Sequence, residues 1–296
     1  MIQDIEPAKF FNHYEEQKAA KADFAFFFSE GKVLALYNQE SKSLNFPTYG
    51  DFSDKTSSAT YLFSIDNQKY FLMPEKAELP AGLSDFSFYT LRQLRDLPLA
   101  PEAKVSLFAA FSAYHLWKWY DDNKFCGHCG HPLEHDSVER ALFCPACKSK
   151  IYPRINPAVI IGILNQKKDK ILITKYRKGY SHSALVAGFT EFGETLEQTV
   201  EREVMEEVGL KVKNIRYYKS QPWALAQDIL AGFFCEVEGD DKIKMDESEL
   251  KYAQWVSREE VELQPNDYSL TNEMMKMFKS GEEDFSWNVR SIKSKN

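Results

Sequence analysis

Several features that are common in membrane and secreted proteins are missing from this sequence. Its first residues, MIQDIEPAKFFNHYEEQKAA, lack the basic start and the uninterrupted apolar core of a signal peptide. No run approaches the roughly 20 apolar residues that a helix needs to span a bilayer. The five cysteines form two CxxC pairs and one isolated residue, which is not the distribution of a disulfide framework. We therefore expect a cytoplasmic protein that does not act at a membrane.

A surplus of positive charge is also missing. The formal net charge is −7, which argues against a general polyanion-binding surface, because such surfaces depend on dense lysine and arginine. The 22 Phe and 15 Tyr supply ample material for hydrophobic cores, and 296 residues are enough for more than one domain.

The chain divides into four predicted segments. Residues 1–100 are predicted to be β-rich, with hairpin turns at Glu30-Gly31 and Asp66-Asn67. Apolar residues at helical spacing predict a linker helix over 101–121. A small cysteine-containing module follows at 122–152, and the last predicted domain covers 153–290. We therefore expect an α+β fold, and we expect residues 290–296 to fray.

The cysteine pairs predict a zinc ribbon. Cys126 and Cys129 form one pair, Cys144 and Cys147 form the other, and the stretch between them contains a plausible hairpin. Two such pairs suit two knuckles that present four thiolates to one tetrahedral Zn²⁺, and four thiolates leave no open position for catalysis. The alternatives are reduced buried cysteines and, less favoured, a redox pair that would need its own activating environment.

One stretch of the last domain concentrates charged residues at helical spacing. It is GFTEFGETLEQTVEREVMEEVGL, residues 188–210. Residues 196–208 are predicted to form a helix that ends at Gly209. Glu203, Glu206 and Glu207 stand at i, i+3 and i+4, so their carboxylates converge on one face. The plain alternative is a solvated acidic face, whereas a hard cation such as Mg²⁺ or Mn²⁺ would turn the repulsion into binding.

Further elements are predicted around this helix. Alternating or continuous apolar runs predict strands, and two stretches near the end of the chain predict helices at 258–263 and 269–280. The predicted strands are 157–164, 170–174, 185–187, 212–218, 229–237 and 253–256.

The 188–210 stretch matches the Nudix box, G-x5-E-x7-R-E-U-x-E-E-x-G-U, at every specified position. Nine such positions would coincide by chance in a chain of this length with a probability of about 10⁻⁷. The sequence therefore resembles the Nudix hydrolases, which cleave a nucleoside diphosphate linked to another group. This resemblance implies an α/β/α sandwich for the last domain.

Three features resemble the NADH pyrophosphatase subfamily in particular. They are the zinc ribbon directly before the Nudix domain, the Ser220-Gln-Pro-Trp223 segment after the box, and the order of the domains. The resemblance implies a homodimeric, metal-dependent hydrolase that splits NAD(H) into nicotinamide mononucleotide and AMP, and that in some relatives removes NAD caps from RNA.

The resemblance also implies roles for individual residues. Glu203, Glu206, Glu207, Glu249 and the backbone carbonyl of Ala187 would bind the divalent cations. Arg202 would pair with a glutamate of the box, and Glu194 would shape the loop. The residues implied to bind the substrate are Tyr152, Phe189, Gln221, Pro222, Trp223, Glu139 and Arg92.

The segment after Trp223 departs from the subfamily pattern SQPWPFPxS. Ala224-Leu225-Ala226 replaces Pro-Phe-Pro, which removes two rigid prolines and one aromatic ring, and Asp228 replaces the final serine. This keeps two alternatives open. One is a Nudix hydrolase for another nucleoside diphosphate derivative, such as ADP-ribose or FAD. The other is a catalytically inactive nucleotide-sensing protein, against which the complete glutamate set argues.

Overall fold

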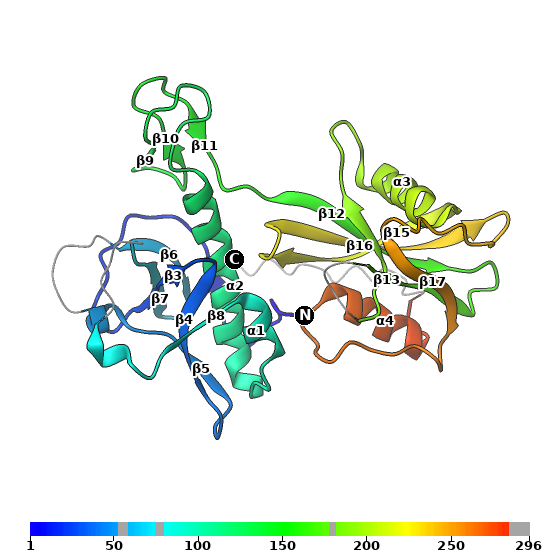
Figure 1. Cartoon of the computed structure of the whole chain (residues 1–296), viewed down its shortest axis with the longest axis horizontal. Helices are drawn as coiled ribbons and strands as arrows, with labels where there is room; N and C mark the ends of the chain where they lie inside the picture. The colour runs from blue at the N-terminus through cyan, green and yellow to red at the C-terminus, as the bar shows by residue number, and fades with distance from the viewer. Residues whose placement is uncertain (53–58, 75–79, 178–181, 284–296) are drawn as a thin grey trace, which may run out of the picture. The chain divides into compact units, whose positions relative to one another are not determined.

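The computed structural model describes residues 1–52, 59–74, 80–177 and 182–283 (Figure 1). The chain divides into two compact units. The C-terminal unit contains Met1, residues 156–221 and the residues from 229 onward. The N-terminal unit contains residues 2–155 and the short segment 222–228.

The N-terminal unit is built on two small sheets. One has the strand order β1-β6-β7-β2, and the other has the order β3-β4-β5 with β8 paired to β4. The strands are β1 (Phe10–Phe11), β2 (Phe24–Phe26), β3 (Phe28–Ser29), β4 (Lys32–Asn38), β5 (Ser43–Asn45), β6 (Thr60–Ile65), β7 (Gln68–Leu72) and β8 (Ser87–Tyr89). Both predicted hairpin turns are present, and Glu30 and Gly31 have positive φ angles, as a tight two-residue turn requires.

Helices complete the N-terminal unit. The short helix α1 (Leu91–Asp96) begins at a Thr90 capping box, and α2 (Lys104–Asp122) confirms that the predicted 101–121 stretch is helical. The buried residues of α2 include the large side chains Leu107, Phe111 and Trp119, which explains the aromatic pattern of this stretch. The 3-10 turns are η1 (Tyr49–Phe52), η2 (Ala81–Leu83) and η3 (Pro101–Ala103).

The zinc ribbon is a three-stranded antiparallel sheet that follows α2. Its strands are β9 (Glu134–His135), β10 (Leu142–Phe143) and β11 (Lys150–Ile151), in the order β11-β10-β9. The pairing of β9 with β10 confirms the hairpin predicted between the two cysteine pairs.

The C-terminal unit contains one larger mixed sheet. Its order is β15-β16-β12-β13-β17, and β14 also pairs with β12. The strands are β12 (Asn156–Leu164), β13 (Lys170–Tyr176), β14 (Val186–Phe189), β15 (Lys211–Trp223), β16 (Asp228–Glu238) and β17 (Leu250–Ser257). Each of the six predicted strands is present, with β15 and β17 several residues longer than predicted.

Two helices cover opposite faces of this sheet, which gives the expected α/β/α sandwich (Figure 1). The helix α3 (Leu196–Val208) buries Val200, Val204 and Val208 in one core. The helix α4 (Leu270–Ser280) buries Leu270 and Phe278 in a separate core on the other side. Within the residues that the structure describes, no helix has the length and apolarity needed to cross a membrane.

The predicted helix at 258–263 is wrong. Residues 258–260 form a single turn. The Ser257 hydroxyl and backbone N–H both donate to the Glu260 carboxylate, and the Glu260 N–H donates to the Ser257 carbonyl. Serine side chains that close such local hydrogen bonds compete with helix formation, and Pro265 follows a few residues later.

Candidate metal centre and zinc ribbon

Capping interactions at both ends define the first and last residues of α3. Thr195 accepts a hydrogen bond from the Gln198 N–H at 3.2 Å, and the Gln198 side chain accepts one from the Thr195 N–H at 2.8 Å. At the other end, Gly209 adopts the left-handed conformation with φ 66°. Because both ends are fixed and the valine stripe is buried, the rotation of the glutamates about the helix axis is fixed as well.

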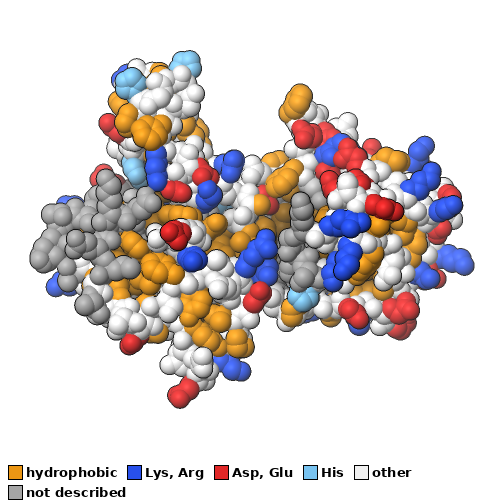
Figure 2. All heavy atoms as spheres, in the orientation of Figure 1, with side chains coloured by type: hydrophobic (Ala, Val, Ile, Leu, Met, Phe, Trp, Pro, Cys, Tyr) orange, Lys and Arg blue, Asp and Glu red, His pale blue; other side chains and the backbone are white. Residues whose placement is uncertain are grey.

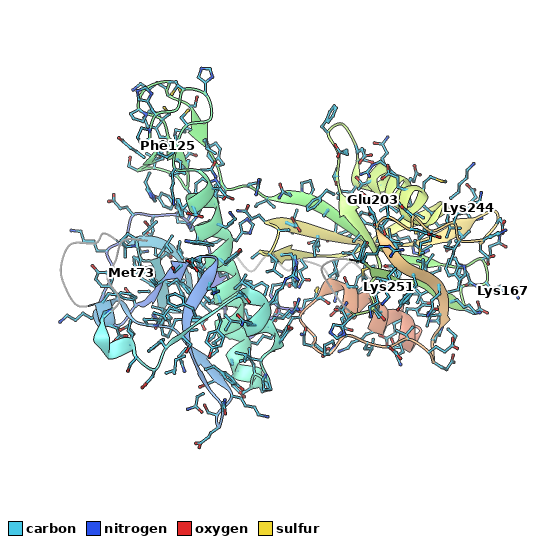
Figure 3. All side chains as sticks on the ribbon, in the orientation of Figure 1. Met73, Phe125, Lys167, Glu203, Lys244 and Lys251 are labelled. Carbon is cyan, nitrogen blue, oxygen red and sulfur yellow. The ribbon has the colours of Figure 1, made fainter. Side chains whose placement is uncertain are left out.

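Gly188 lets β14 approach the glutamates closely. A Cβ atom at this position would lie 2.0 Å from the carboxyl carbon of Glu203, so no side chain is compatible with the observed position of that carboxylate. Figure 3 labels Glu203 on α3. The glycine of the motif therefore has a packing role that brings the end of β14 against the acidic face of α3.

Arg202 links Glu194, in the loop before the helix, to two carboxylates of the helix. Its guanidinium lies 2.6 Å from Glu194, 2.8 Å from Glu203 and 2.9 Å from Glu206, and it also donates to the Phe189 carbonyl at 2.8 Å. The hydrogen bond from Arg202 lowers the pKa of Glu194 to about 2. The predicted pairing of Arg202 with a box glutamate is therefore present in the structure.

Glu207 is the most buried of the candidate ligands. It is 3% exposed, and the Tyr176 hydroxyl lies 3.0 and 3.1 Å from its two oxygens. Burial raises its pKa to about 8, and the negative charges of Glu203 and Glu249 add to the effect. Burial also raises the pKa of Glu203. Carboxylates that are costly to ionise together gain most from a bound cation.

Glu249 comes from a different part of the chain. It lies directly before β17, and its carbonyl accepts a hydrogen bond from the Arg177 N–H at 2.9 Å. The preceding loop is held by the end of α3, because the Asp246 N–H donates to the Glu207 carbonyl at 2.8 Å. The end of the helix thus anchors the loop that leads to the fourth carboxylate.

These groups have the chemistry of a site for a hard divalent cation. Carboxylate oxygens and a backbone carbonyl are the ligands that Mg²⁺ and Mn²⁺ prefer. Within the described part of the chain, no lysine or arginine forms an ion pair with Glu207, so its charge is left for a cation to compensate. Among the residues that the structure describes, the four ribbon cysteines have all their ligand atoms within 4.8 Å of one another. Taken together, the carboxylate oxygens of the glutamates lie farther apart than this.

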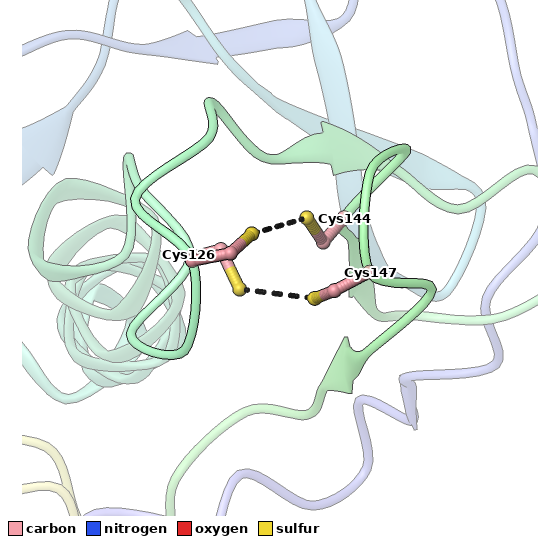
Figure 4. Close-up of side chains that lie close together, drawn as sticks. Cys126, Cys144 and Cys147 are labelled. Atoms are coloured by element: carbon pink, nitrogen blue, oxygen red, sulfur yellow. Dashed lines mark hydrogen bonds between the residues drawn. The ribbon is translucent and has the colours of Figure 1, made fainter.

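The ribbon cysteines form two matching knuckles (Figure 4). The Cys126 and Cys144 carbonyls accept hydrogen bonds from the N–H groups of Gly130 and Lys148, at 2.8 and 2.9 Å. Gly130 and Lys148 both have positive φ angles. The Sγ atoms of Cys126 and Cys147 are 3.5 Å apart, and those of Cys129 and Cys144 are 3.4 Å apart. This arrangement fits the predicted tetrahedral zinc and leaves no ligand position for catalysis.

The predicted substrate-binding residues differ in accessibility. The side chains of Phe189 and Tyr152 are 50% and 54% exposed, so their rings are available for stacking. The Tyr152 hydroxyl donates to Glu139 at 3.0 Å, which joins two of the predicted residues. Arg92 is exposed on α1.

Gln221 has a structural role that sequence reasoning missed. Its side chain is fully buried, donates to the Tyr268 carbonyl at 2.7 Å and accepts from the Leu270 N–H at 2.7 Å. Leu270 begins α4, so this glutamine satisfies one of the backbone donors that a helix start leaves unpaired. No local sequence signal indicates this role, because Gln221 and Leu270 are 49 positions apart along the chain.

The segment after Trp223 forms the turn of the β15–β16 hairpin, which Pro222 and Trp223 precede. Trp223 packs against Phe111 of α2 with ring centroids 5.7 Å apart. Pro222 and Ala224 line an apolar cavity of about 350 Å³ in the N-terminal unit. Gln227 accepts a hydrogen bond from Arg154 at 2.5 Å, and Asp228 is buried, so its charge is not presented on the surface.

Comparisons with known proteins match two segments of this chain to domain families. Residues 154–278 match the NUDIX domain, and residues 121–152 match the NADH pyrophosphatase zinc ribbon domain. The chain therefore carries a Nudix domain behind a zinc ribbon of the NADH pyrophosphatase type, as its motifs predict.

Its similar relatives include two NAD-capped RNA hydrolases NudC. That of Salmonella schwarzengrund (strain CVM19633) is 44% identical over 153 residues, which are 51% of this chain and 58% of the relative. That of Citrobacter koseri (strain ATCC BAA-895 / CDC 4225-83 / SGSC4696) is 44% identical over 165 residues, which are 54% of this chain and 62% of the relative. The matches thus span about three fifths of the relatives' length. The crystal structure of a NUDIX hydrolase from Nitrosomonas europaea superposes with a TM-score of 0.45 at 24% identity, over 55% of this chain and 96% of that chain.

Proposed function

We propose that this protein hydrolyses the pyrophosphate bond of NAD(H) or a related dinucleotide, giving AMP and nicotinamide mononucleotide. One observation carries the proposal: α3, Gly188 and Arg202 assemble the carboxylates of a complete Nudix box in a chain that also has the matching zinc ribbon. The similarity to NAD-capped RNA hydrolases supports the same chemistry and extends the proposed substrates to NAD-capped RNA.

The proposed mechanism assigns a role to each group. Glu203, Glu206, Glu207, Glu249 and the Ala187 carbonyl bind Mg²⁺ or Mn²⁺. A cation held there would supply charge neutralisation at the diphosphate and a lower pKa for bound water. One of the glutamates accepts the proton of the attacking water.

The supporting residues have separate parts in the proposal. Arg202 donates hydrogen bonds to Glu203 and Glu206 of α3. It also contacts Glu194 and the Phe189 carbonyl, which connects these helix carboxylates to the end of β14 and the loop before α3. Phe189 and Tyr152 stack on rings of the substrate. We also propose substrate contacts for Glu139, Arg92, Pro222 and Trp223. For Gln221 we propose a structural role, because its side chain accepts a hydrogen bond from the first residue of α4.

The test is incubation of the purified protein with NADH and Mg²⁺ or Mn²⁺, followed by identification of AMP and nicotinamide mononucleotide. Glu206→Gln is the informative variant, because Glu206 has the most exposed side chain of the three helix glutamates that we assign to the metal. We expect turnover to fall about 100-fold or more while nucleotide binding stays detectable. Activity within a few-fold of the unaltered protein would contradict the assignment of Glu206.

The Ala224-Leu225-Ala226 sequence favours a second candidate function, which is hydrolysis of another nucleoside diphosphate derivative such as ADP-ribose or FAD. This sequence lacks the aromatic ring that the subfamily pattern has after Trp223, and such a ring could stack on the group that is joined to the AMP half of the substrate. A panel of NADH, NAD-capped RNA, ADP-ribose and FAD, compared by kcat/KM for AMP release, distinguishes these substrates. A protein that binds them without AMP release would instead be a nucleotide sensor.

We also propose a homodimer in a reducing, cytoplasmic setting. The subfamily resemblance supports the dimer. The two CxxC pairs of the ribbon and the isolated Cys235, none of which forms a disulfide, fit a reducing environment. Figure 2 shows basic side chains scattered among acidic ones on the displayed face, with no continuous basic stripe among the described residues there. The net charge of −7 fits a small-molecule or cap substrate better than a long RNA-binding surface.

A further inference from the structure

A tyrosine outside the Nudix box joins two of the proposed cation ligands. Tyr176 is the last residue of β13, and its ring packs against the core between the sheet and α3. Its hydroxyl lies 3.0 and 3.1 Å from the two oxygens of Glu207 and 3.1 Å from the backbone nitrogen of Ala187. One atom of β13 therefore touches both α3 and β14.

The direction of these hydrogen bonds follows from the available protons. The Ala187 N–H is a donor, so the Tyr176 oxygen accepts from it. The phenol has one proton of its own, and the Glu207 carboxylate at 3.0 Å is a closer acceptor than the Ala187 carbonyl at 3.4 Å. The proton is therefore directed at Glu207. The backbone of β14 and the carboxylate of α3 are held together through the same hydroxyl.

This contact opposes the electrostatic tendency of the site. The negative charges of Glu203 and Glu249 repel an ionised Glu207 carboxylate, so without a cation this carboxylate needs another contact to hold it beside them. Within the described residues, no basic side chain forms an ion pair with it, so the tyrosine hydroxyl supplies its side-chain hydrogen bond. Partners of this kind fix the orientation of metal ligands and tune their affinity.

We propose that Tyr176 is a positioning residue of the cation site, whose hydroxyl holds Glu207 and the Ala187 backbone where both reach one divalent cation. This inference rests on the proposed function, because it takes these two groups as ligands. Tyr176 does not touch the substrate, and it acts through Glu207.

The test uses Tyr176→Phe in the 296-residue chain, since phenylalanine keeps the ring that packs on the core. Binding of Mn²⁺ is followed by the electron paramagnetic resonance signal of the free ion. We expect the dissociation constant for Mn²⁺ to rise about 10-fold or more. Tyr218→Phe is the matched control, because it also removes a buried tyrosine hydroxyl that donates to a glutamate, Glu273, at 3.1 Å on the other side of the sheet. Its Mn²⁺ affinity should not change.

A double variant tests whether the hydroxyl acts through Glu207. In the Glu207→Gln background, Tyr176→Phe should weaken Mn²⁺ binding by much less than 10-fold. An equal effect in both backgrounds, or unaltered affinity in the single Tyr176→Phe variant, overturns the inference while leaving the hydrolase assignment intact. An unaltered protein that neither binds Mn²⁺ nor releases AMP overturns the proposed function itself, and the inference with it.

A second measurement covers the case in which Tyr176→Phe does not fold. Tyrosine is labelled with ¹³C at Cζ in the otherwise unaltered protein, and Mg²⁺ is added. We expect one tyrosine signal to shift on Mg²⁺ binding, and the same signal to shift in Glu207→Gln without Mg²⁺. The absence of any tyrosine signal that responds to both changes overturns the role of Tyr176.

Discussion

Replacing Gly188 with alanine would displace one carboxylate while sparing the fold. The added Cβ would lie 2.0 Å from the Glu203 carboxyl carbon and Oε1, and 2.3 Å from its Oε2. Ordinary van der Waals contact begins at 3.4 Å, so the carboxylate has to retreat by about 1.4 Å. The displaced atoms are the end of a flexible side chain, so the backbone and the core need not move.

The expected consequence is a large loss of activity with a small loss of stability. Displacement of a catalytic group by about 1 Å costs on the order of 100-fold in rate. We therefore expect kcat/KM for AMP release to fall about 100-fold or more, which is about 2.7 kcal/mol of transition-state stabilisation. The free energy of unfolding in urea should change by less than about 1.5 kcal/mol, in the absence of added metal.

Gly162→Ala provides the opposite pattern in the same unit. A Cβ there would lie 2.6 Å from two ring carbons of Phe234, whose side chain is fully buried in the core under α4. Overpacking of this kind costs about 1–3 kcal/mol of stability. Because Gly162 does not contact the glutamates, the kcat/KM of the folded fraction should stay near that of the unaltered protein.

The two variants are compared by urea unfolding and by AMP release at saturating Mg²⁺. The reasoning is refuted if Gly188→Ala retains activity within a few-fold, because the carboxylate then tolerates the displacement. It is also refuted if Gly188→Ala loses stability as strongly as Gly162→Ala, because the glycine then serves the fold rather than the site.

Two further predictions concern buried polar groups. The pKa of Glu207 is about 8 in the folded, metal-free protein against 4.5 for an ordinary glutamate, so its stabilising contribution is complete below pH 4.5 and is lost as the pH rises through 8. Urea unfolding without metal should show that the free energy of unfolding falls with pH, by at most about 5 kcal/mol for this group. Glu207→Gln should remove this pH dependence. The same dependence of unfolding free energy on pH in both proteins would contradict the burial argument. Gln221→Ala should lower the free energy of unfolding by about 2–3 kcal/mol because it leaves the Tyr268 carbonyl and the Leu270 N–H unpaired, while the KM for NADH stays unchanged. A raised KM at unaltered stability would instead identify Gln221 as a substrate contact.

Elements with local signals could be predicted closely. The helix α3 begins and ends at the predicted residues, because the Thr195–Gln198 capping box and Gly209 act within a few positions of each end. The two cysteine knuckles follow from short loops whose turn residues, Gly130 and Lys148, lie in the same motif. The spacing of the glutamates along α3 placed them on one face without knowledge of any other element.

Local patterns misled where a side chain offered the backbone another partner. The polar stretch 258–263 has acceptable helix formers, yet the Ser257–Glu260 hydrogen bonds close a single turn instead. Gln221 belongs to a recognisable motif, and its burial beside the start of α4 depends on how β15 meets residues 268–270 across the fold. Such roles depend on contacts between distant residues.

The sequence by itself determined the class of chemistry, because the carboxylates, the arginine and the cysteines of this protein stand at spacings that one helix and two short turns convert directly into geometry. Only the tertiary structure decided which groups surround them. Gly188 meets Glu203, and Tyr176 meets both Glu207 and Ala187, because the packing of α3 on the sheet brings together three segments that are separated along the chain. Hydrophobic burial of the valine face of α3 sets that packing, and it thereby sets the distances on which cation binding depends.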